Sequence, residues 1–363
     1  MLDLLEKKMI SYPLRITNNR GGVHEAIIST ASTSEAVRPR IKIIRHEDGF
    51  SGASIIDAHS TEPWILVVHI DGEVSIWNAQ NQTRMMAIHD IDMHGEDPKK
   101  FYVRSAKFIE PLQDFVVGDS VGYIHVYSYE KVEKLHNFRG HGKSVSSLAV
   151  HPIEPFVLSA SRDKLIKLWN WETGWQCIRI FEGHSDWVHQ VRFNPQTAMN
   201  TFASCSRDST IKIWNMYSPT PVTSFDCNSR DVRALDYFIL GGDLQYLVTS
   251  FSWSGSARIW DLQTNTCIKL INGLHRSGYN IAAIEGLPGR PILLTVSDDL
   301  TVAFCDSTTH RYEKRIKFNL GFIKDFAYIN MTKSIAVLYE GGIAIIETVD
   351  LPQRFALDDG DSG

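Results

Sequence analysis

The sequence predicts an all-β protein, and within that class a β-propeller of seven blades. Short apolar runs recur with a period of about 45 residues, which is typical of propeller blades made of four strands. Six repeat ends align at residues 77, 127, 169, 214, 260 and 305, so the steps between them are 50, 42, 45, 46 and 45 residues. Each repeat also contains several short runs of β-type residues separated by Gly, Pro, Asp and Asn.

The third repeat illustrates how the blades are predicted. Its four β-type runs lie at 145–150, 156–160, 165–170 and 176–181. The aligned repeats end in EVSIWN, YIHVYS, LIKLWN, TIKIWN, SARIWD and TVAFCD. A weaker seventh repeat follows at 323–329, 334–339 and 343–348.

A ring of blades has to close, because an open ring leaves sheet edges unpaired. The run RIKIIR at 40–45 precedes the first blade, and we predict that it supplies the outer strand of the last blade. The expected domains are therefore a mobile N-terminal extension at 1–38, the propeller at 39–350 and a flexible acidic tail at 351–363.

Composition indicates an intracellular globular protein. The 363 residues are 43% hydrophobic and 22% charged, with a net charge of −5. We find neither an apolar run of the ~18 residues needed by a membrane helix nor a secretory leader. Five scattered cysteines without a CxxC pair favour reduced thiols over a disulfide framework or a zinc site, so we expect no metal and no cofactor.

Two repeats carry a Ser, a His and an Asp that out of context suggest a hydrolase. The sets, each with its Trp, are His141, Ser159, Asp163 and Trp169 in the third repeat and His184, Ser204, Asp208 and Trp214 in the fourth. A catalytic set occurs once, whereas this one occurs twice at matching spacing. We therefore interpret both as buried hydrogen-bond chains from Asp through His and Ser to the indole, and we expect no enzyme activity.

Several longer phrases resemble a known family. They are HSTEPWIL (59–66), VRSAKFI (103–109), AVHPIEPFVLSASRDKLIKLWNWETGW (149–175), FEGHSDWVHQVRFNPQTAMNTFASCSRDSTIKIWN (181–215) and DLQTNTCIKLINGLH (261–275). On these residues the sequence resembles WD40-repeat proteins, and among them the N-terminal propeller of coatomer (COPI) β′ subunits, over about residues 40–349. Family members continue into a second propeller and a helical solenoid, so we expect this chain not to be a complete coat subunit.

The resemblance also implies a peptide-binding site, and the residues at its positions predict that this chain has lost it. In the family, the top of the propeller holds the C-terminal dilysine tail of membrane cargo, with basic residues on the carboxylate and acidic residues on the lysines. By position, the first basic pair falls on Gly52 and Ser54, the second-blade Arg is kept as Arg104, and the two acids fall on Lys143 and Arg162. Two cations where the family has carboxylates predict that dilysine cargo is not bound.

Equivalent loop positions in the repeats predict a basic top face instead. The residues expected there as partner-binding are Arg104, Lys143, Arg162, His189, Arg207, Arg230, Arg233, Trp253 and Lys324. One interpretation is a surface for an acidic or phosphorylated segment, with Trp253 as an aromatic anchor. The other is ordinary solvated charge, partly paired with nearby aspartates, and the sequence leaves both open.

The leading functional hypothesis is a non-enzymatic, coatomer β′-like scaffold in COPI (Golgi to ER) transport, cytoplasmic and peripheral at Golgi membranes. Its expected partners are proteins or peptides, namely coat subunits or an acidic or phosphorylated segment. We expect no nucleic acid, no membrane insertion and a monomer on its own. The alternative is an adaptor propeller outside trafficking, for example for a ubiquitin ligase, although the blade ends WNAQ, WNWE, WNMY and WDLQ lack the WDxR pattern of one such group.

Overall fold

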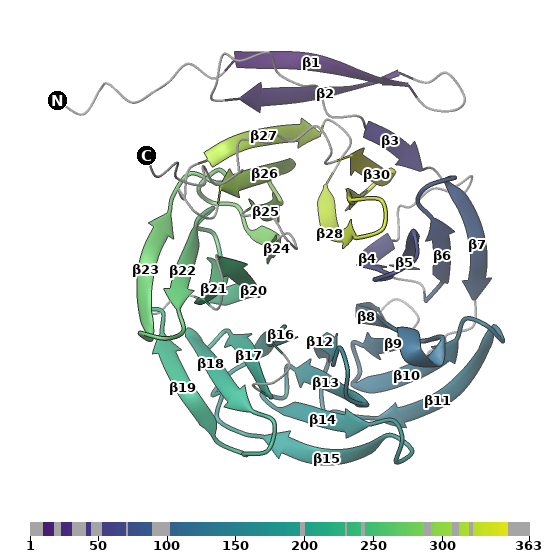
Figure 1. Ribbon diagram of the computed structural model, residues 1–363, viewed down its shortest axis with the longest axis vertical. Coiled ribbons are helices and arrows are strands. Elements are labelled where there is room, and N and C mark those ends of the chain that lie inside the picture. Colours follow the sequence, from purple (N-terminus) through teal and green to yellow (C-terminus); the bar gives the residue numbers. More distant parts are fainter. Residues whose placement is uncertain are drawn as a thin grey trace, which may run out of the picture.

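The computed structural model describes residues 10–17, 23–30, 41–44, 53–69, 72–88, 102–196, 200–228, 231–240, 244–286, 292–306, 312–318 and 322–347. These residues form seven antiparallel sheets arranged as blades around a central axis, as Figure 1 shows. The predicted all-β fold, a seven-bladed propeller, is confirmed. Within the same residues, no helix combines the length and the apolar character needed to cross a bilayer.

The blades follow one another along the chain. Blade 1 is β4 (Ala53–Ala58), β5 (Trp64–His69), β6 (Val74–Asn78) and β7 (Thr83–Ile88). Blade 2 is β8 (Val103–Ile109), the 3-10 helix η2 (Glu110–Leu112), β9 (Asp114–Asp119), β10 (Tyr123–Ser128) and β11 (Glu133–Arg139). Blade 3 is β12 (Val145–Val150), β13 (Phe156–Ser161), β14 (Ile166–Asn170) and β15 (Gln176–Phe181). Blade 4 is β16 (Val188–Phe193), β17 (Thr201–Ser206), β18 (Thr210–Asn215) and β19 (Pro221–Asp226).

The remaining blades complete the circle. Blade 5 is β20 (Val232–Leu240), β21 (Leu244–Phe251), β22 (Ala257–Asp261) and β23 (Thr266–Ile271). Blade 6 contains β24 (Ile281–Gly286), β25 (Ile292–Ser297), β26 (Thr301–Asp306) and β27 (Tyr312–Phe318). Blade 7 contains β28 (Ile323–Ile329), β29 (Ser334–Tyr339) and β30 (Gly342–Glu347), and β3 (Ile41–Ile44) is its fourth strand.

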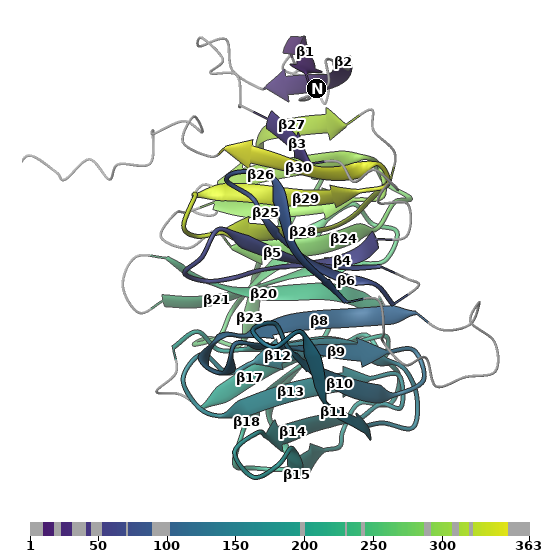
Figure 2. The same cartoon turned by 90° about the vertical axis from the view of Figure 1, so that its right-hand side faces the viewer.

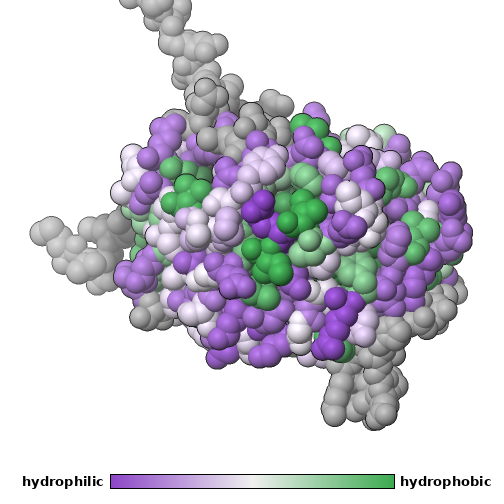
Figure 3. Space-filling view, turned by 90° about the horizontal axis from the view of Figure 1, so that it is seen from below, coloured by the Kyte–Doolittle hydropathy of each residue, from purple (hydrophilic) through white to green (hydrophobic). Residues whose placement is uncertain are grey.

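The apolar cores lie between neighbouring blades. One of them joins Leu158 and Leu168 of blade 3 to Val191, Phe202 and Trp214 of blade 4. The second strands of the blades are buried along nearly their whole length, whereas the outer strands β15, β19 and β23 are largely exposed. Figure 3 looks onto this rim and shows separate apolar areas in a largely hydrophilic surface. Each blade is therefore stabilised by its neighbours, as in other repeat folds.

Strand β3 brings the beginning of the propeller to its end. It pairs antiparallel with β30, with Ile43 opposite Ala344 and Ile44 opposite Ile343. Residues 40–45 were expected to be the outer strand of the last blade, and β3 covers 41–44 of that segment. Blade 7 thus combines strands from both ends of the described chain.

Two further strands lie outside the ring. β1 (Ile10–Thr17) and β2 (Val23–Thr30) form a hairpin, and β2 pairs with β27 from Ala26 opposite Phe318 to Thr30 opposite Lys314. Figures 1 and 2 both place this hairpin beside the outer edge of blade 6. Sequence analysis assigned residues 1–38 to a mobile extension and did not predict this hairpin, because the edge that it pairs with lies far away in sequence. The tail at 351–363 lies outside the described residues, and the three domain boundaries stay predictions.

Candidate functional site

A β-bulge recurs at the same place in all seven inner strands. The pairing register shifts after the first residue of each strand, so the second residue has no direct partner. The residues at this position are Ser54, Arg104, Ser146, His189, Arg233, Ala282 and Lys324. All seven line one central cavity of about 790 Å³. Because bulges redirect side chains, this repeated irregularity explains why one side chain per blade faces the mouth of the channel.

We call the side of the ring formed by the loops before the inner strands, and by the turns between second and third strands, the top face. Trp187 lies on it, in the loop before β16, between two arginines. The Cζ atoms of Arg162 and Arg207 lie 4.5 and 4.6 Å from the centroid of its ring. The backbone N–H of Arg162 donates to the carbonyl of Ser144 at 3.0 Å, and that of Arg207 to the carbonyl of Trp187 at 2.9 Å. Trp187 therefore holds two guanidinium groups from neighbouring blades by cation–π contact.

Arg104 belongs to the same charged region. Its Cζ lies 4.5 Å from the ring centroid of Tyr102, and its Nε is buried without a hydrogen-bond partner among the described residues. The pKa of Arg162 is lowered by burial first and also by the positive charges of Arg104, Arg233 and Arg207. The other three guanidinium groups therefore each repel that of Arg162, and we call Arg104, Arg162, Arg207 and Arg233 the basic arc.

Other residues predicted on the top face have local partners. His189 Nε2 lies 2.8 Å from Asp231 Oδ1, and Lys324 Nζ donates to the carbonyl of Ala53 at 2.7 Å. Burial would raise the pKa of Asp231, but hydrogen bonds from His189 and Ser252 lower it. The side chains of His189 and Lys324 are therefore less available to a ligand than the basic arc.

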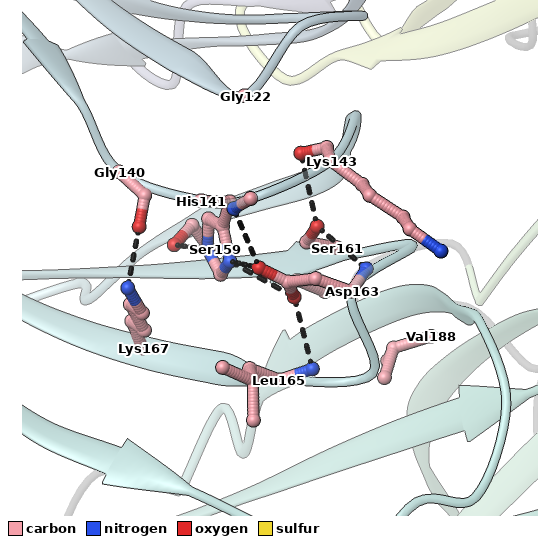
Figure 4. Close-up of polar contacts among 12 residues, drawn as sticks. Gly122, Gly140, His141, Lys143, Ser159, Ser161, Asp163, Leu165, Lys167 and Val188 are labelled. Atoms are coloured by element: carbon pink, nitrogen blue, oxygen red, sulfur yellow. Dashed lines mark hydrogen bonds and ion pairs between the residues drawn. The ribbon is translucent and has the colours of Figure 1, made fainter.

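Of the last two predicted cations, Lys143 and Arg230, the structure describes only the first. Lys143 is exposed, and Figure 4 shows its side chain extending away from Asp163. Arg230 lies outside the described residues. Whether the predicted set binds a partner stays a hypothesis.

Exposed aromatic side chains lie on the blade 5–7 side of the top face. Trp253 is 67% exposed, Phe322 62% and Tyr279 38%. Trp253 has a φ of 59°, and its backbone N–H donates to Asn280 Oδ1 at 3.1 Å while its carbonyl accepts from Gly278 N–H at 3.0 Å. We call Trp253, Tyr279 and Phe322 the aromatic arc. Only Trp253 was predicted from the sequence.

A second layer of charges lies below the mouth, and sequence analysis missed it. Asp57, Lys107, Arg192, Asp236 and Glu285 occupy the fifth position of their inner strands and line the cavity together with Asp325. Lys107 Nζ contacts Asp57, and Arg192 Nε lies 3.7 Å from Asp236 Oδ1. Burial raises the pKa of Glu285 to about 8 and that of Asp325 to about 6. The charged fifth position in five inner strands is the signal that could have revealed this layer.

The Ser, His and Asp of blade 3 form a continuous hydrogen-bond chain, shown in part in Figure 4. His141 Nδ1 lies 2.9 Å from Asp163 Oδ2, and His141 Nε2 lies 2.7 Å from Ser159 Oγ. The indole N–H of Trp169 donates to the same Ser159 Oγ at 2.8 Å. Ser159 is fully buried and its hydroxyl is used on both sides, so it offers no nucleophile to a substrate.

Blade 4 repeats this arrangement. His184 Nδ1 lies 2.8 Å from Asp208 Oδ2, its Nε2 lies 2.7 Å from Ser204 Oγ, and Trp214 N–H donates to Ser204 at 2.8 Å. The two sets therefore have the same geometry in neighbouring blades.

A related set in blade 6 was missed by sequence analysis. His275 Nδ1 lies 3.2 Å from Asp299 Oδ1, and its Nε2 lies 2.8 Å from Thr295 Oγ1. His275 precedes Asp299 by the same 24 residues that separate His184 from Asp208, so the spacing was present although Thr replaces Ser.

The comparisons with known proteins agree with this geometry. Residues 132–170, 175–215 and 219–261 match the family model described as WD domain, G-beta repeat. The propeller therefore contains WD40 repeats in these segments.

Coatomer subunits are among the curated proteins that the chain resembles. Coatomer subunits beta′-1 and beta′-2 of Arabidopsis thaliana are each 40% identical over 236 residues, which is 65% of this chain and 24% of theirs. Coatomer subunit beta′ of Rattus norvegicus is 34% identical over 293 residues, 80% of this chain and 31% of its own. The expected resemblance to coatomer β′ subunits is confirmed, and the chain spans between about a quarter and a third of the length of these relatives.

Proposed function

We propose that this chain is a non-enzymatic interaction scaffold of the coatomer β′ type, acting in COPI vesicle transport in the cytoplasm and at the periphery of Golgi membranes. The WD40 propeller and the similarity to coatomer β′ subunits support this assignment. The buried and saturated Ser-His-Asp sets support a structural rather than a catalytic use of these residues. Its partners are then proteins that dock on the faces of the ring.

We further propose that the top face has exchanged a dilysine site for an anion site. The observation that carries this proposal is Arg162, which stands where the family resemblance places a carboxylate and is surrounded by other guanidinium groups. Among the described residues, neither Arg162 nor Lys143 has a carboxylate within ion-pair distance. A lysine tail would meet like charges, which costs several kcal/mol by order of magnitude.

Direct binding tests the exchange. A labelled peptide ending in a dilysine motif with a free carboxylate is titrated with wild type and with the double variant Lys143→Asp/Arg162→Asp, by fluorescence anisotropy. We expect no specific binding to wild type and measurable binding to the double variant, because the carboxylates restore attraction to the lysines. Arg179→Asp/Lys269→Asp, on outer strands β15 and β23, changes the net charge equally and should gain nothing. Dilysine binding by wild type that requires the free carboxylate would refute the exchange.

Coat membership is tested separately by co-purification of the tagged full chain from cells. Recovery of coat subunits is expected. Recovery of a stable complex that contains no coat subunit would support the alternative, an adaptor propeller outside trafficking.

A further inference from the structure

We propose that the anion bound by the top face is the phosphate of a phosphoserine or phosphothreonine in an extended segment of a partner protein. The phosphate lies against the basic arc, and an apolar side chain of the same segment packs on the aromatic arc. This inference rests on the anion-binding role proposed above and adds the chemical class of the ligand and its orientation.

The charge of the basic arc fits a phosphate better than a carboxylate. Among the described residues, Arg104, Arg162 and Arg233 have no carboxylate within ion-pair distance. Arg207 Nε lies 3.8 Å from Asp186 Oδ2, and the charge of Arg233 helps to lower the pKa of Asp231. A phosphomonoester brings nearly two negative charges and three acceptor oxygens, whereas a carboxylate brings one charge and two oxygens. Several converging guanidinium groups therefore gain more from one phosphate.

The guanidinium groups are held in place before a ligand arrives. The guanidinium of Arg104 lies over the ring of Tyr102, and those of Arg162 and Arg207 lie over Trp187. These contacts restrict the positions of the three groups, and a guanidinium that makes a cation–π contact can still donate its N–H groups to an anion. Preorganisation of this kind lowers the entropy cost of binding.

The second layer of charges limits how deep the anion goes. Below the basic arc, four carboxyl groups and only two cations line the cavity, namely Asp57, Asp236, Glu285 and Asp325 against Lys107 and Arg192. A phosphate entering this layer would find both cations already paired, Lys107 with Asp57 and Arg192 with Asp236, so it stays at the mouth. The segment that carries it then runs across the top face, where the aromatic arc lies on the other side of the mouth.

The aromatic arc has the properties of an anchor. Its three rings are exposed, and the backbone of Trp253 is fixed by two hydrogen bonds to the neighbouring loop, so little order is lost on binding. Exposed rings in a fixed loop are favoured contact residues for peptides. A flat lipid surface would reach these rings but not the partly buried Arg162 at the mouth, and for this reason we favour a peptide over a membrane.

The test uses the full chain and short labelled peptides rich in Gly and Ser. Each peptide carries one central phosphoserine, with a single Leu placed at successive positions on either side; matched peptides carry Ser or Glu instead of phosphoserine. We expect the phosphopeptides to bind at least about tenfold more tightly than the Ser and Glu versions. One Leu position should strengthen binding further, and inorganic phosphate should compete.

Two variants test the contributions of the basic arc and the aromatic arc to binding separately. Arg162→Ala should weaken phosphopeptide binding by about tenfold or more, whereas Arg179→Ala on β15 should leave it unchanged. Trp253→Ala should abolish the gain from Leu and keep the preference for phosphate, whereas Tyr217→Ala, an equally exposed aromatic in the turn after β18, should do neither. Melting curves check that all variants fold.

Equal binding of phosphorylated and unphosphorylated peptides would overturn the proposal. So would phosphopeptide binding that survives Arg162→Ala unchanged in the folded variant, or binding to phosphatidylcholine vesicles with a phosphoinositide but to none of the peptides. None of these outcomes affects co-purification with coat subunits, so the inference and the scaffold function can fail independently.

Discussion

The carboxylate of Asp163 shows how a single residue connects blade structure to pH. Burial alone would raise its pKa, but the hydrogen bond and charge of His141 lower it, as do the N–H groups of Gly142 at 2.9 Å and Leu165 at 3.1 Å. The net result is a pKa lowered from 3.8 to about 2. Asp163 therefore stays ionised in the folded chain at pH values where it would be protonated in the unfolded chain.

A folded-state pKa below the unfolded value means that Asp163 contributes stability above about pH 4, which is lost as the pH falls towards 2. We expect Asp163→Asn to lower the free energy of unfolding at pH 7 and to flatten its decline between about pH 5 and pH 2. Urea unfolding over a pH series measures both effects.

The control for this prediction is Glu172→Gln, an exposed carboxylate in the turn after β14. Its unfolding curves should follow wild type across the series. An acid limb of unchanged steepness in Asp163→Asn would show that the hydrogen-bond set does not couple this carboxylate to folding.

At the scale of elements, the hairpin β1–β2 extends the sheet of one blade only, which is blade 6. Strand β2 pairs with β27, so the outer edge of blade 6 is covered, while β15 of blade 3 stays an edge strand. We expect removal of residues 1–38 to accelerate amide hydrogen exchange in β27, because its backbone loses a partner, and to leave β15 unchanged. Exchange measured by mass spectrometry on the two chains tests this, and equal protection of β27 in both would mean that the hairpin does not pair in solution.

The elements also explain which features could be predicted from the sequence. Blades repeat one local pattern, so the spacing of Trp77, Trp169, Trp214 and Trp260 was enough to place the strands. The hairpin pairs with a strand almost 300 residues away, and no local pattern reports such a contact. Non-local pairing is thus the main part of the fold that the repeat pattern could not supply.

The candidate site, like the fold, could be predicted from the sequence only in part. Sequence position was enough to bring Arg104, His189, Arg233 and Lys324 to one cavity, because the bulge recurs in every inner strand. The cation–π contacts of two arginines with Trp187 depend on side-chain packing between blades 3 and 4, which a blade-by-blade comparison does not contain.

At the scale of the whole molecule, charge is distributed unevenly. The chain has a net charge of −5, yet the basic arc lies along one side of the mouth of the channel, on blades 2 to 5. A local positive field in a negative protein attracts anions to one place and speeds their encounter, and this effect weakens with salt. Binding of an anionic ligand to the top face should therefore be stronger at low than at physiological ionic strength.

Closure of the ring is the other property of the whole molecule, and it depends on strand β3. Ile44 is 2% exposed and packs in a core shared by blade 7 and blade 1, together with Ala53 and Ile343. We expect Ile44→Ala to lower the free energy of unfolding by about 2–4 kcal/mol, because it leaves a cavity at the junction where the ring closes.

Lys42, two residues before Ile44, provides the control variant that makes the role of β3 in ring closure testable. Lys42 lies on the same strand, has a side chain that is 45% exposed and pairs with Glu347 at 2.7 Å. Lys42→Ala should cost less than about 1 kcal/mol, as is usual for exposed ion pairs. If the ring is closed by β3, Ile44→Ala should shift the whole unfolding transition, measured by fluorescence and by circular dichroism, because all blades depend on the junction. A small shift equal to that of Lys42→Ala would instead mean that the blades are held together without β3.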